Sequence, residues 1–307
     1  MGKGFKTPIG STLFDIAKNT YTEVRDQWDN LCGGGLYWAR NRNDAQLNKA
    51  VYKSTITNVE QILLGVRLFK ITGDRSYLEH AIQVYDWLVG PSGLVTGDGV
   101  VMDGVRADAC QEFTPNQHSY NAGLFLGGAA LLFEATKDAK YMQTISRVFN
   151  NYEKVFVQNN IFIDPCEVSG QPPCRQNQAQ FKGVAIYSLN YLYQYSSDSG
   201  IKNKIKTWIE TSAAAMFNIC TPGYECSNFW LPTSASRPVD VHNQMNALFM
   251  SNTLSSIKSA TIEGGKQRLS PVGKKNKQKK SDGMGVTVTI GIWSSIFAAT
   301  FAAIYLV

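Results

Sequence analysis

The sequence predicts an all-α protein built from repeated pairs of helices. Three observations support this: an apolar stretch without a polar face, a motif that recurs after it, and helical periodicity beyond each copy. The stretch is 122–133, where four small residues (Ala122, Gly123, Gly127 and Gly128) let other backbones approach closely. A helix that is apolar all round is buried on all sides. About a dozen apolar residues are too few to span a bilayer, so a core helix is expected.

The recurring motif is first seen at the end of this stretch, as Leu132-Phe133-x-x-Thr136-x-Asp138. Similar copies lie 64 residues earlier, ending at Asp74, and 60 residues later, ending at Asp198. Each Asp stands where the N-cap of a following helix belongs. The segments after the three copies show helical spacing, with buried-type residues at Tyr77, Ala81, Tyr85 and Leu88, at Tyr141, Ile145, Val148 and Tyr152, and at Ile201, Ile205, Trp208 and Ser212.

The repeating unit is therefore a helix hairpin with a buried inner helix and a half-exposed outer helix. We expect inner helices at about 51–70, 117–135, 178–195 and 240–258, preceded by a lone outer helix at about 11–27. Helix pairs at a fixed period form an open solenoid or a closed α/α toroid.

Composition indicates a globular domain without affinity for nucleic acid. Of the 30 basic and 24 acidic residues, seven basic and one acidic residue lie in 264–283, which leaves 23 of each elsewhere. The net charge of +6 thus comes from one basic segment, and the folded part carries no positive surface for nucleic acid.

The six cysteines suggest disulfides and an oxidising compartment. Cys166 with Cys174 and Cys220 with Cys226 would each close a short loop between helices, which leaves Cys32 to pair with Cys110. The alternatives are that all thiols are free or that they bind a metal. The spacings and the count of three histidines argue against a metal site.

The two ends of the chain differ from its middle. We divide the chain into an unstructured start (1–8), an α/α toroid (9–260), a basic flexible linker (261–285) and a hydrophobic C-terminal segment (286–307). Small residues, a polar spacer and an apolar tail are typical of a GPI-anchor signal, although the tail is also long enough for a transmembrane helix. No apolar stretch of a signal peptide is visible at the start.

Polar residues at the heads of the inner helices predict a binding site. Tyr52 to Asn58, His118 to Asn121, Gln178 to Lys182, and His242 with Gln244 all stand at such positions. In a toroid these heads converge at one end and line a common pocket, which suits a polyhydroxylated ligand held by neutral hydrogen bonds.

Two loops add candidates for the same end. Trp28, Tyr37 and Trp38 flank three consecutive glycines and offer flat faces for stacking on a sugar ring, although they could equally cap helix ends as core residues. The link 91–116 carries Asp98, Asp103 and Asp108, which we interpret as solvated turns rather than as a cation site.

With these residues in view, the chain resembles glycoside hydrolase family 76, the α-1,6-mannanases, and within it the fungal cell-wall branch. The resemblance covers about 10–258 and rests on WDNLCGGGLYW (28–38), YKSTITN (52–58), ITGDRSYLEHAIQVYDWLVG (71–90), SYNAGLFLGGAALLF (119–133), CEVSGQPPCRQNQAQFKG (166–183), CTPGYECSNFW (220–230) and HNQMNAL (242–248). It implies an (α/α)6 toroid without cofactor or metal, which cuts or transfers α-1,6-mannose linkages with retention. The branch is secreted, commonly GPI-anchored and linked to wall biogenesis.

The resemblance also implies site residues and partners. The substrate-binding residues would be Trp28, Asp29, Trp38, Tyr52, Asn58, Tyr120, Asn121 and Lys182. The partners would be α-1,6-mannan or a GPI glycan, with a membrane reached through the C-terminal segment and a monomeric state for the complete domain. The expected location is the cell surface or cell wall.

The catalytic pair of the family is missing from the sequence. The family carries two adjacent aspartates on an inner helix upstream of the WD-x-x-CGGGL stretch, and this chain contains no Asp-Asp. A retaining glycosidase needs two carboxylates about 5 Å apart. We therefore expect a toroid that is incomplete at its N-terminus, with the pair upstream of Met1, and no catalysis by this chain alone. The alternatives are a non-catalytic protein that binds mannan or a GPI glycan, and a helical scaffold for protein partners.

Overall fold

The computed structural model describes residues 11–42, 51–168, 174–232 and 239–262. The predicted start (1–8), nearly all of the basic linker (261–285) and the C-terminal segment (286–307) lie outside these residues. Within the described ranges, no helix is both long and apolar enough to cross a membrane.

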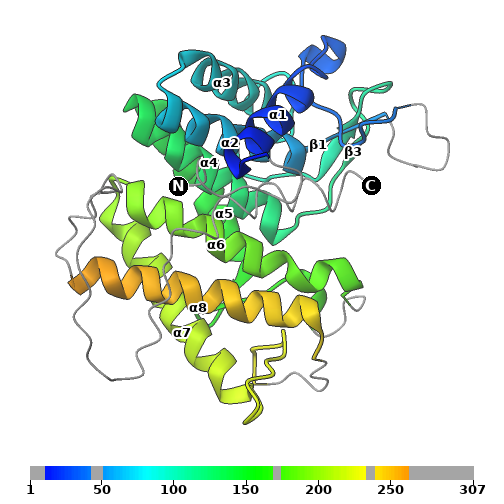
Figure 1. Cartoon of the computed structure of the whole chain (residues 1–307). Helices are drawn as coiled ribbons and strands as arrows, with labels where there is room; N and C mark the ends of the chain where they lie inside the picture. The colour runs from blue at the N-terminus through cyan, green and yellow to red at the C-terminus, as the bar shows by residue number, and fades with distance from the viewer. Residues whose placement is uncertain (1–10, 43–50, 169–173, 233–238, 263–307) are drawn as a thin grey trace.

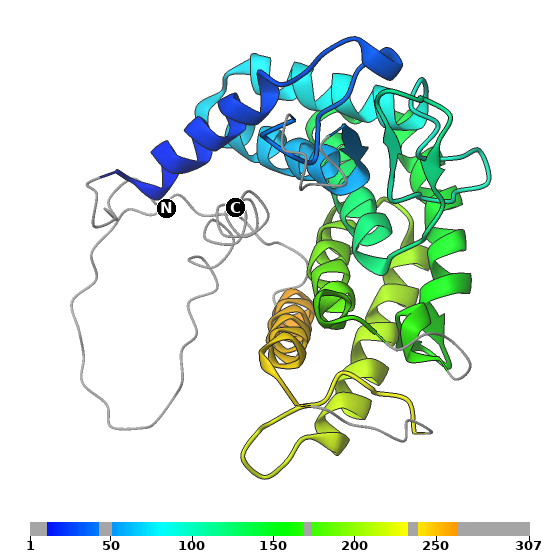
Figure 2. The same ribbon diagram turned by 90° about the vertical axis from the view of Figure 1, so that its right-hand side faces the viewer.

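The helices alternate between an inner and an outer layer, as the repeat predicts. The inner helices are α2 (Thr55–Thr72), α4 (Ser119–Thr136), α6 (Phe181–Tyr195) and α8 (Val241–Ile262). The outer helices are α1 (Leu13–Arg25), α3 (Arg75–Val89), α5 (Ala139–Phe156) and α7 (Ser199–Ile219). Consecutive inner helices pack against one another, and α2, α4 and α6 each pack against the outer helix that follows. The helices follow an arc from α1 to α8 (Figures 1 and 2).

The recurring motif is the turn inside each hairpin. The Thr72 hydroxyl donates to the carbonyl of Leu68 and accepts from the backbone N–H of Asp74. Asp74 in turn caps α3 by accepting from the N–H of Ser76. Thr136 with Asp138 repeats this arrangement, and Asp198 caps α7 in the same way. The predicted N-caps are confirmed.

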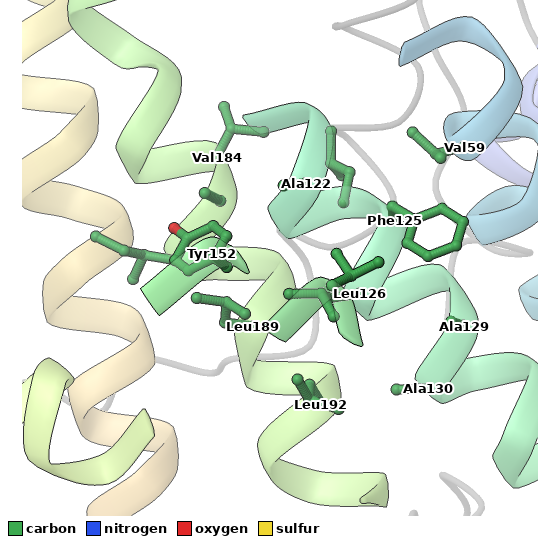
Figure 3. Packing of buried hydrophobic residues seen from close by; sticks show 14 of the residues in the cluster. Val59, Ala122, Phe125, Leu126, Ala129, Ala130, Tyr152, Val184, Leu189 and Leu192 are labelled. Atoms are coloured by element: carbon green, nitrogen blue, oxygen red, sulfur yellow. The ribbon is translucent and has the colours of Figure 1, made fainter. Parts of the chain in front are cut away.

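Helix α4 lies at the centre of the core. Its residues from Asn121 to Leu132 are all buried, and in Figure 3 its side chains lie between those of the neighbouring helices. A Cβ atom on Gly123 would stand 2.6 Å from the Cα of Ala185, and one on Gly127 would stand 2.8 Å from the carbonyl oxygen of Ser188. The small residues therefore bring the backbones of α4 and α6 together, as predicted.

Short strands and 3-10 turns occur in the links, which the all-helical prediction left as loops. β1 (Tyr52–Ser54), β2 (Gly104–Arg106) and β3 (Phe113–Thr114) form an antiparallel sheet in that order. β4 (Val157–Gln158) and β5 (Ile161–Phe162) form a hairpin. Three 3-10 turns are η1 (Leu31–Gly33), η2 (Pro165–Glu167) and η3 (Gln176–Gln180). In Figure 1, β1, β3 and the yellow start of α8 lie toward the same side.

Three disulfides join the cysteines in the predicted pairs. Cys32 bonds to Cys110, Cys166 to Cys174 and Cys220 to Cys226. The first is long-range, with its cysteines 78 positions apart in the sequence. It ties the 3-10 turn after α1 to the loop between β2 and β3.

Candidate functional site

The candidate site is the face of the arc that is formed by the N-terminal ends of the inner helices. Links from the outer helices return to this end, and three of them place a polar side chain beside the heads of two inner helices. These side chains are Asp103 for α2 and α4, Asp164 for α4 and α6, and Asn228 for α6 and α8. We call these three residues and their hydrogen-bond partners, together with Lys53, which precedes α2, and its partner Asp29, the polar rim.

The first part of the rim is built around Lys53, just before α2. Its side chain has no exposed surface. Its ammonium donates to Asp29 Oδ1 at 2.6 Å, to the carbonyl of Leu31 at 2.8 Å and to that of Gly34 at 2.6 Å. The Tyr37 hydroxyl donates to Asp29 Oδ2 at 2.7 Å. Burial alone would raise the pKa of Asp29, but these hydrogen bonds and the Lys53 charge hold it below its usual value.

The second part surrounds Asp103. Its carboxylate accepts from the Tyr52 hydroxyl at 2.8 Å, the Tyr120 hydroxyl at 3.3 Å and the Asn121 amide at 3.1 Å. Asp103 is 6% exposed, so the interpretation of this residue as part of a solvated turn was wrong. Asp98 and Asp108 are exposed. The difference arises because β2 follows directly after Asp103 and pairs with β1, which brings Asp103 against the head of α2.

The third part is Asp164, which follows the β4–β5 hairpin. Asn159 and Asn160 both have positive φ in the tight turn of this hairpin, a conformation that Asn tolerates better than most residues. The turn directs the chain back so that Asp164 Oδ1 accepts from the backbone N–H of Ser119, the first residue of α4, at 3.4 Å. The backbone N–H of Lys182 also faces this carboxyl. Burial outweighs both amides and raises the pKa of Asp164 to about 6.

The fourth part joins α6 and α8 through Lys182. Its fully buried ammonium donates to Glu167 Oε2 at 2.7 Å and to the carbonyl of Asn228, and it lies 3.9 Å from the centroid of the Trp230 ring. The Asn228 amide donates to Glu167 Oε1 at 2.9 Å. Asn246 of α8 donates to Asn228 and accepts from the N–H of Gly183. Burial raises the pKa of Glu167 to about 7 and lowers that of Lys182.

Five of the eight predicted substrate-binding residues belong to this rim. They are Asp29, Tyr52, Tyr120, Asn121 and Lys182. Among them, the Asp29 side chain is 30% exposed, Tyr120 is partly exposed, and Lys182 has no exposed surface. The Asp29 side chain is therefore accessible for direct contact with a ligand. The Lys182 side chain is not, and it can affect a ligand only by positioning the groups that it hydrogen-bonds.

The other three predicted residues lie in different surroundings. Trp28 packs edge-on against His80 and Trp87 of α3. Asn58 is fully buried and bonds both the N–H and the carbonyl of Leu36. Trp38 is partly exposed and donates its backbone N–H to the carbonyl of Tyr52 at 2.8 Å. Trp28 and Trp38 are both partly exposed, whereas Asn58 is closed to solvent.

Sequence reasoning missed Asp164, Glu167 and Asn228 as site residues. A usable signal was present, because each follows an outer helix by a short link and stands next to a cysteine loop. Their burial could not be read from the sequence, since it depends on the path that each link takes.

An open hollow lies beside Tyr37 and Arg42, the two side chains that contact Asp29 Oδ2. It is lined by Tyr37, Arg40, Asn41, Arg42 and Val51. The Arg42 guanidinium lies 4.5 Å from the centroid of the Tyr37 ring and 3.4 Å from Asp29 Oδ2, and its side chain is 45% exposed. The exposed Arg42 side chain thus lies next to Asp29 Oδ2 at this hollow.

The rim is a network of hydrogen bonds among side chains and backbone groups. Its carboxylates Asp103, Asp164 and Glu167 are buried and engaged by other side chains or by backbone amides, and Asp29 is the exposed member of the set. The described residues contain no group of three or more metal-binding side chains. The rim therefore presents fixed donors and acceptors, which suit the hydroxyl groups of a sugar.

Comparison with known proteins places this geometry among carbohydrate-active proteins. The model of glycosyl hydrolase family 76 matches residues 3–263. The mannan endo-1,6-α-mannosidase DCW1 of Saccharomyces cerevisiae is 30% identical over 259 residues, which cover 81% of this chain and 56% of that protein. The chain thus spans about half the length of the curated relatives that it matches.

Two solved structures share the fold. The crystal structure of Dfg5 from Chaetomium thermophilum, in complex with glucosamine, has a TM-score of 0.72 at 25% identity, covering 82% of this chain and 63% of that one. An inactive variant of the α-1,6-mannanase GH76A of Salegentibacter, with two consecutive aspartates replaced by asparagine, was solved with α-1,6-mannotriose. It has a TM-score of 0.66 at 18% identity, covering 78% and 68%.

Proposed function

The chain belongs to glycosyl hydrolase family 76, and on that premise we propose that the protein binds and processes α-1,6-linked mannan. The observation that carries the proposal is the rim of fixed hydrogen-bonding groups, with the Asp29 carboxylate exposed in it. The names of the relatives support the substrate class, since DCW1 is a mannan endo-1,6-α-mannosidase and the bacterial neighbour was solved with α-1,6-mannotriose. Hydrolysis and transfer of mannosyl units are both proposed only for a protein that carries this chain together with consecutive aspartates like those replaced in the inactive bacterial variant.

Binding is tested by calorimetric titration of the purified chain with α-1,6-mannotriose, using maltotriose as the control sugar. Asp29→Asn should weaken binding about tenfold, because a hydrogen bond to a charged acceptor is worth about 1.5–3 kcal/mol. Asp26→Asn is the matched control, since Asp26 lies three residues away and its side chain is 63% exposed. Equal affinity for both sugars, or equal affinity of the two variants, would contradict the proposal.

For catalysis, we propose that this chain by itself binds mannan without cleaving it. Retaining hydrolysis needs two carboxylates about 5 Å apart, and the sequence contains no consecutive aspartates like those replaced in the inactive bacterial variant. Incubation with α-1,6-mannan and assay of new reducing ends should therefore give no product above background. Mapping the 5′ end of the transcript would show whether an Asp-Asp pair is encoded in frame upstream.

A second candidate function is non-catalytic binding of mannan or of a GPI glycan. The lack of an Asp-Asp pair favours it. If the transcript encodes no such pair and the chain binds mannotriose without turnover, this second function replaces the first.

For location, we propose that the protein is held at the cell surface through a GPI anchor. The polar spacer and the apolar segment 286–307 support this. Release of the protein from intact cells by phosphatidylinositol-specific phospholipase C is the expected result. Retention after this treatment, with extraction by detergent, would indicate a transmembrane anchor instead.

A further inference from the structure

The ammonium of Lys53 is buried completely, which is unusual for a lysine. A buried charge is costly unless it is paired and hydrogen-bonded, and an ammonium has three donors. Lys53 directs them to three acceptors in one loop, namely Asp29, Leu31 and Gly34. The lysine thus connects the beginning and the end of the turn between α1 and Tyr37.

The backbone of Lys53 is itself held in place. Lys53 lies in β1 opposite Val105 of β2, and Ser54, the next residue, is the N-cap of α2. Its side chain therefore extends from a rigid element into a loop whose conformation depends on glycines with positive φ, Gly33 to Gly35. This loop contains Asp29, the exposed carboxylate of the rim.

Lys182 provides the same arrangement at another inner helix. It too has no exposed surface, pairs with one carboxylate, bonds a loop carbonyl and lies over an aromatic ring. The two lysines occupy different places relative to their helices, since Lys53 precedes α2 by two residues and Lys182 is the second residue of α6. The repeat therefore does not explain why the two lysines have the same arrangement. We explain it by a role that both share, which is to hold a loop of the rim.

We propose that Lys53 is a positioning residue for glycan binding, which holds the Asp29 carboxylate and the turn around it without touching the glycan. This proposal rests on the proposed function of mannan binding. It assigns to Asp29 the contact with sugar hydroxyls and to Lys53 the orientation of that carboxylate from its buried side.

Three side chains face the Asp29 carboxylate, beside the backbone N–H of Leu31, which donates to Oδ1 at 3.1 Å. Lys53 donates to Oδ1 from β1, Tyr37 donates to Oδ2 from its own loop, and Arg42 lies 3.4 Å from Oδ2 on the exposed side. Burial tends to raise the pKa of Asp29, whereas Lys53 and Tyr37 lower it. Removing the lysine must therefore raise the pKa of Asp29. As the pH is lowered, glycan binding that needs the charged carboxylate should then be lost at a higher pH than in the unmodified protein.

The test compares Lys53→Met, Asp29→Asn and the double variant in the full chain, with Lys204→Met as the control for an outer-helix lysine that is 49% exposed. Affinity for α-1,6-mannotriose is measured by calorimetry from pH 3.5 to 8, and the Asp29 carboxyl is titrated by ¹³C NMR. We expect Lys53→Met to weaken binding about tenfold and to raise the Asp29 midpoint by about one pH unit. The double variant should bind no worse than Asp29→Asn, since coupled residues are not additive.

Two results would overturn the proposal. One is unchanged affinity and an unchanged Asp29 midpoint in Lys53→Met. The other is a double variant whose loss equals the product of the two single losses, which would mean that Lys53 contacts the glycan. If Lys53→Met does not fold, two other variants replace it in the comparison. The double variant removes both charges of the pair, and Lys53→Gln keeps a hydrogen-bond donor at this position.

Failure of the proposed function gives a different result. If the unmodified chain does not bind mannotriose at all, mannan binding is refuted, and the NMR titration still decides the role of Lys53. A raised Asp29 midpoint in Lys53→Met then supports positioning, and an unmoved midpoint overturns it.

Discussion

At the scale of single residues, the rim depends on charges that are buried and paired. Removing one partner of a buried ion pair typically costs about 3–5 kcal/mol, because the other charge remains without compensation. Lys182 with Glu167 and Lys53 with Asp29 are two such pairs, and they differ in exposure. Glu167 is 3% exposed whereas Asp29 is 30% exposed, so the first pair is closed to solvent and the second is partly open to it.

Glu167 should make the protein more stable in acid than at neutral pH. Its pKa is raised from 4.5 to about 7 in the folded state, chiefly by burial. A raised pKa contributes stability that is fully present below the unfolded pKa and is lost as the pH rises through the folded pKa. Between pH 4.5 and 7 the free energy of unfolding should thus fall by at most about 3 kcal/mol from this group.

Urea unfolding at pH 4.5 and pH 7.5 measures this loss. In the variant Glu167→Gln, the free energy of unfolding should differ less between the two pH values. The difference that remains would include the contribution of Asp164. A variant with the same pH dependence as the unmodified protein would refute the assignment.

Asn58 should prove to be a structural residue. Asn58→Leu leaves both the N–H and the carbonyl of Leu36 without these partners in a fully buried place, which should cost about 3 kcal/mol. The control is Asn151→Leu, since Asn151 bonds Gln117 in a partly exposed setting and should change stability by less than about 1 kcal/mol. Thermal unfolding gives the comparison, and equal melting temperatures would argue that Asn58 is free to serve a ligand.

At the scale of elements, the hairpins are specified by their turns and by their contact faces. Thr72 and Thr136 each bond the preceding turn and the following Asp, and that Asp caps the next helix. A missing cap of this kind costs about 1 kcal/mol. The contact of α4 with α6, in contrast, depends on the absence of side chains at Gly123 and Gly127.

Adding a methyl group in this contact should destabilise the protein. In Gly123→Ala the new Cβ would lie 2.6 Å from the Cα of Ala185, so one helix must shift, at a cost of about 1–3 kcal/mol. Gly97→Ala is the control, because no atom lies within 4 Å of a Cβ there. Chemical denaturation should show a lower midpoint for Gly123→Ala alone. A Gly123→Ala midpoint at or above that of the unmodified protein would contradict the close packing.

At the scale of the whole molecule, the inner helices form one continuous layer, and the disulfides hold the links to it. The hydrogen bonds of the rim run from α2 through α4 and α6 to α8, by way of Asp103, Asp164 and Asn228. The rim therefore connects all four described inner helices near their N-terminal ends. Cys32–Cys110 joins two links that no local contact would bring together.

The disulfides should contribute unequally to stability. Chain-entropy arguments give about 4 kcal/mol for Cys32–Cys110 and about 2 kcal/mol for Cys220–Cys226, whose cysteines are 78 and 6 residues apart. Replacing both cysteines of one pair by serine should lower the melting temperature more for the long-range pair. The opposite order of melting temperatures, measured by calorimetry, would show that the disulfide of the local loop contributes more to stability.

The sequence by itself determined the features that depend on short-range patterns. Helical periodicity, the recurring Thr-x-Asp turn and the spacing of the cysteines predicted the hairpins, their N-caps and the disulfides, because each involves neighbouring residues or a count of remaining partners. Resemblance to a family added the toroid and the substrate class. Only the tertiary structure decided which polar residues meet. Asp103 is buried although it stands in a glycine-rich link, and Asn58 serves the core although it stands at a helix head. Asp164, Glu167 and Asn228 join the rim because their links fold back across the helix heads, and such a path follows from packing over long distances in the chain.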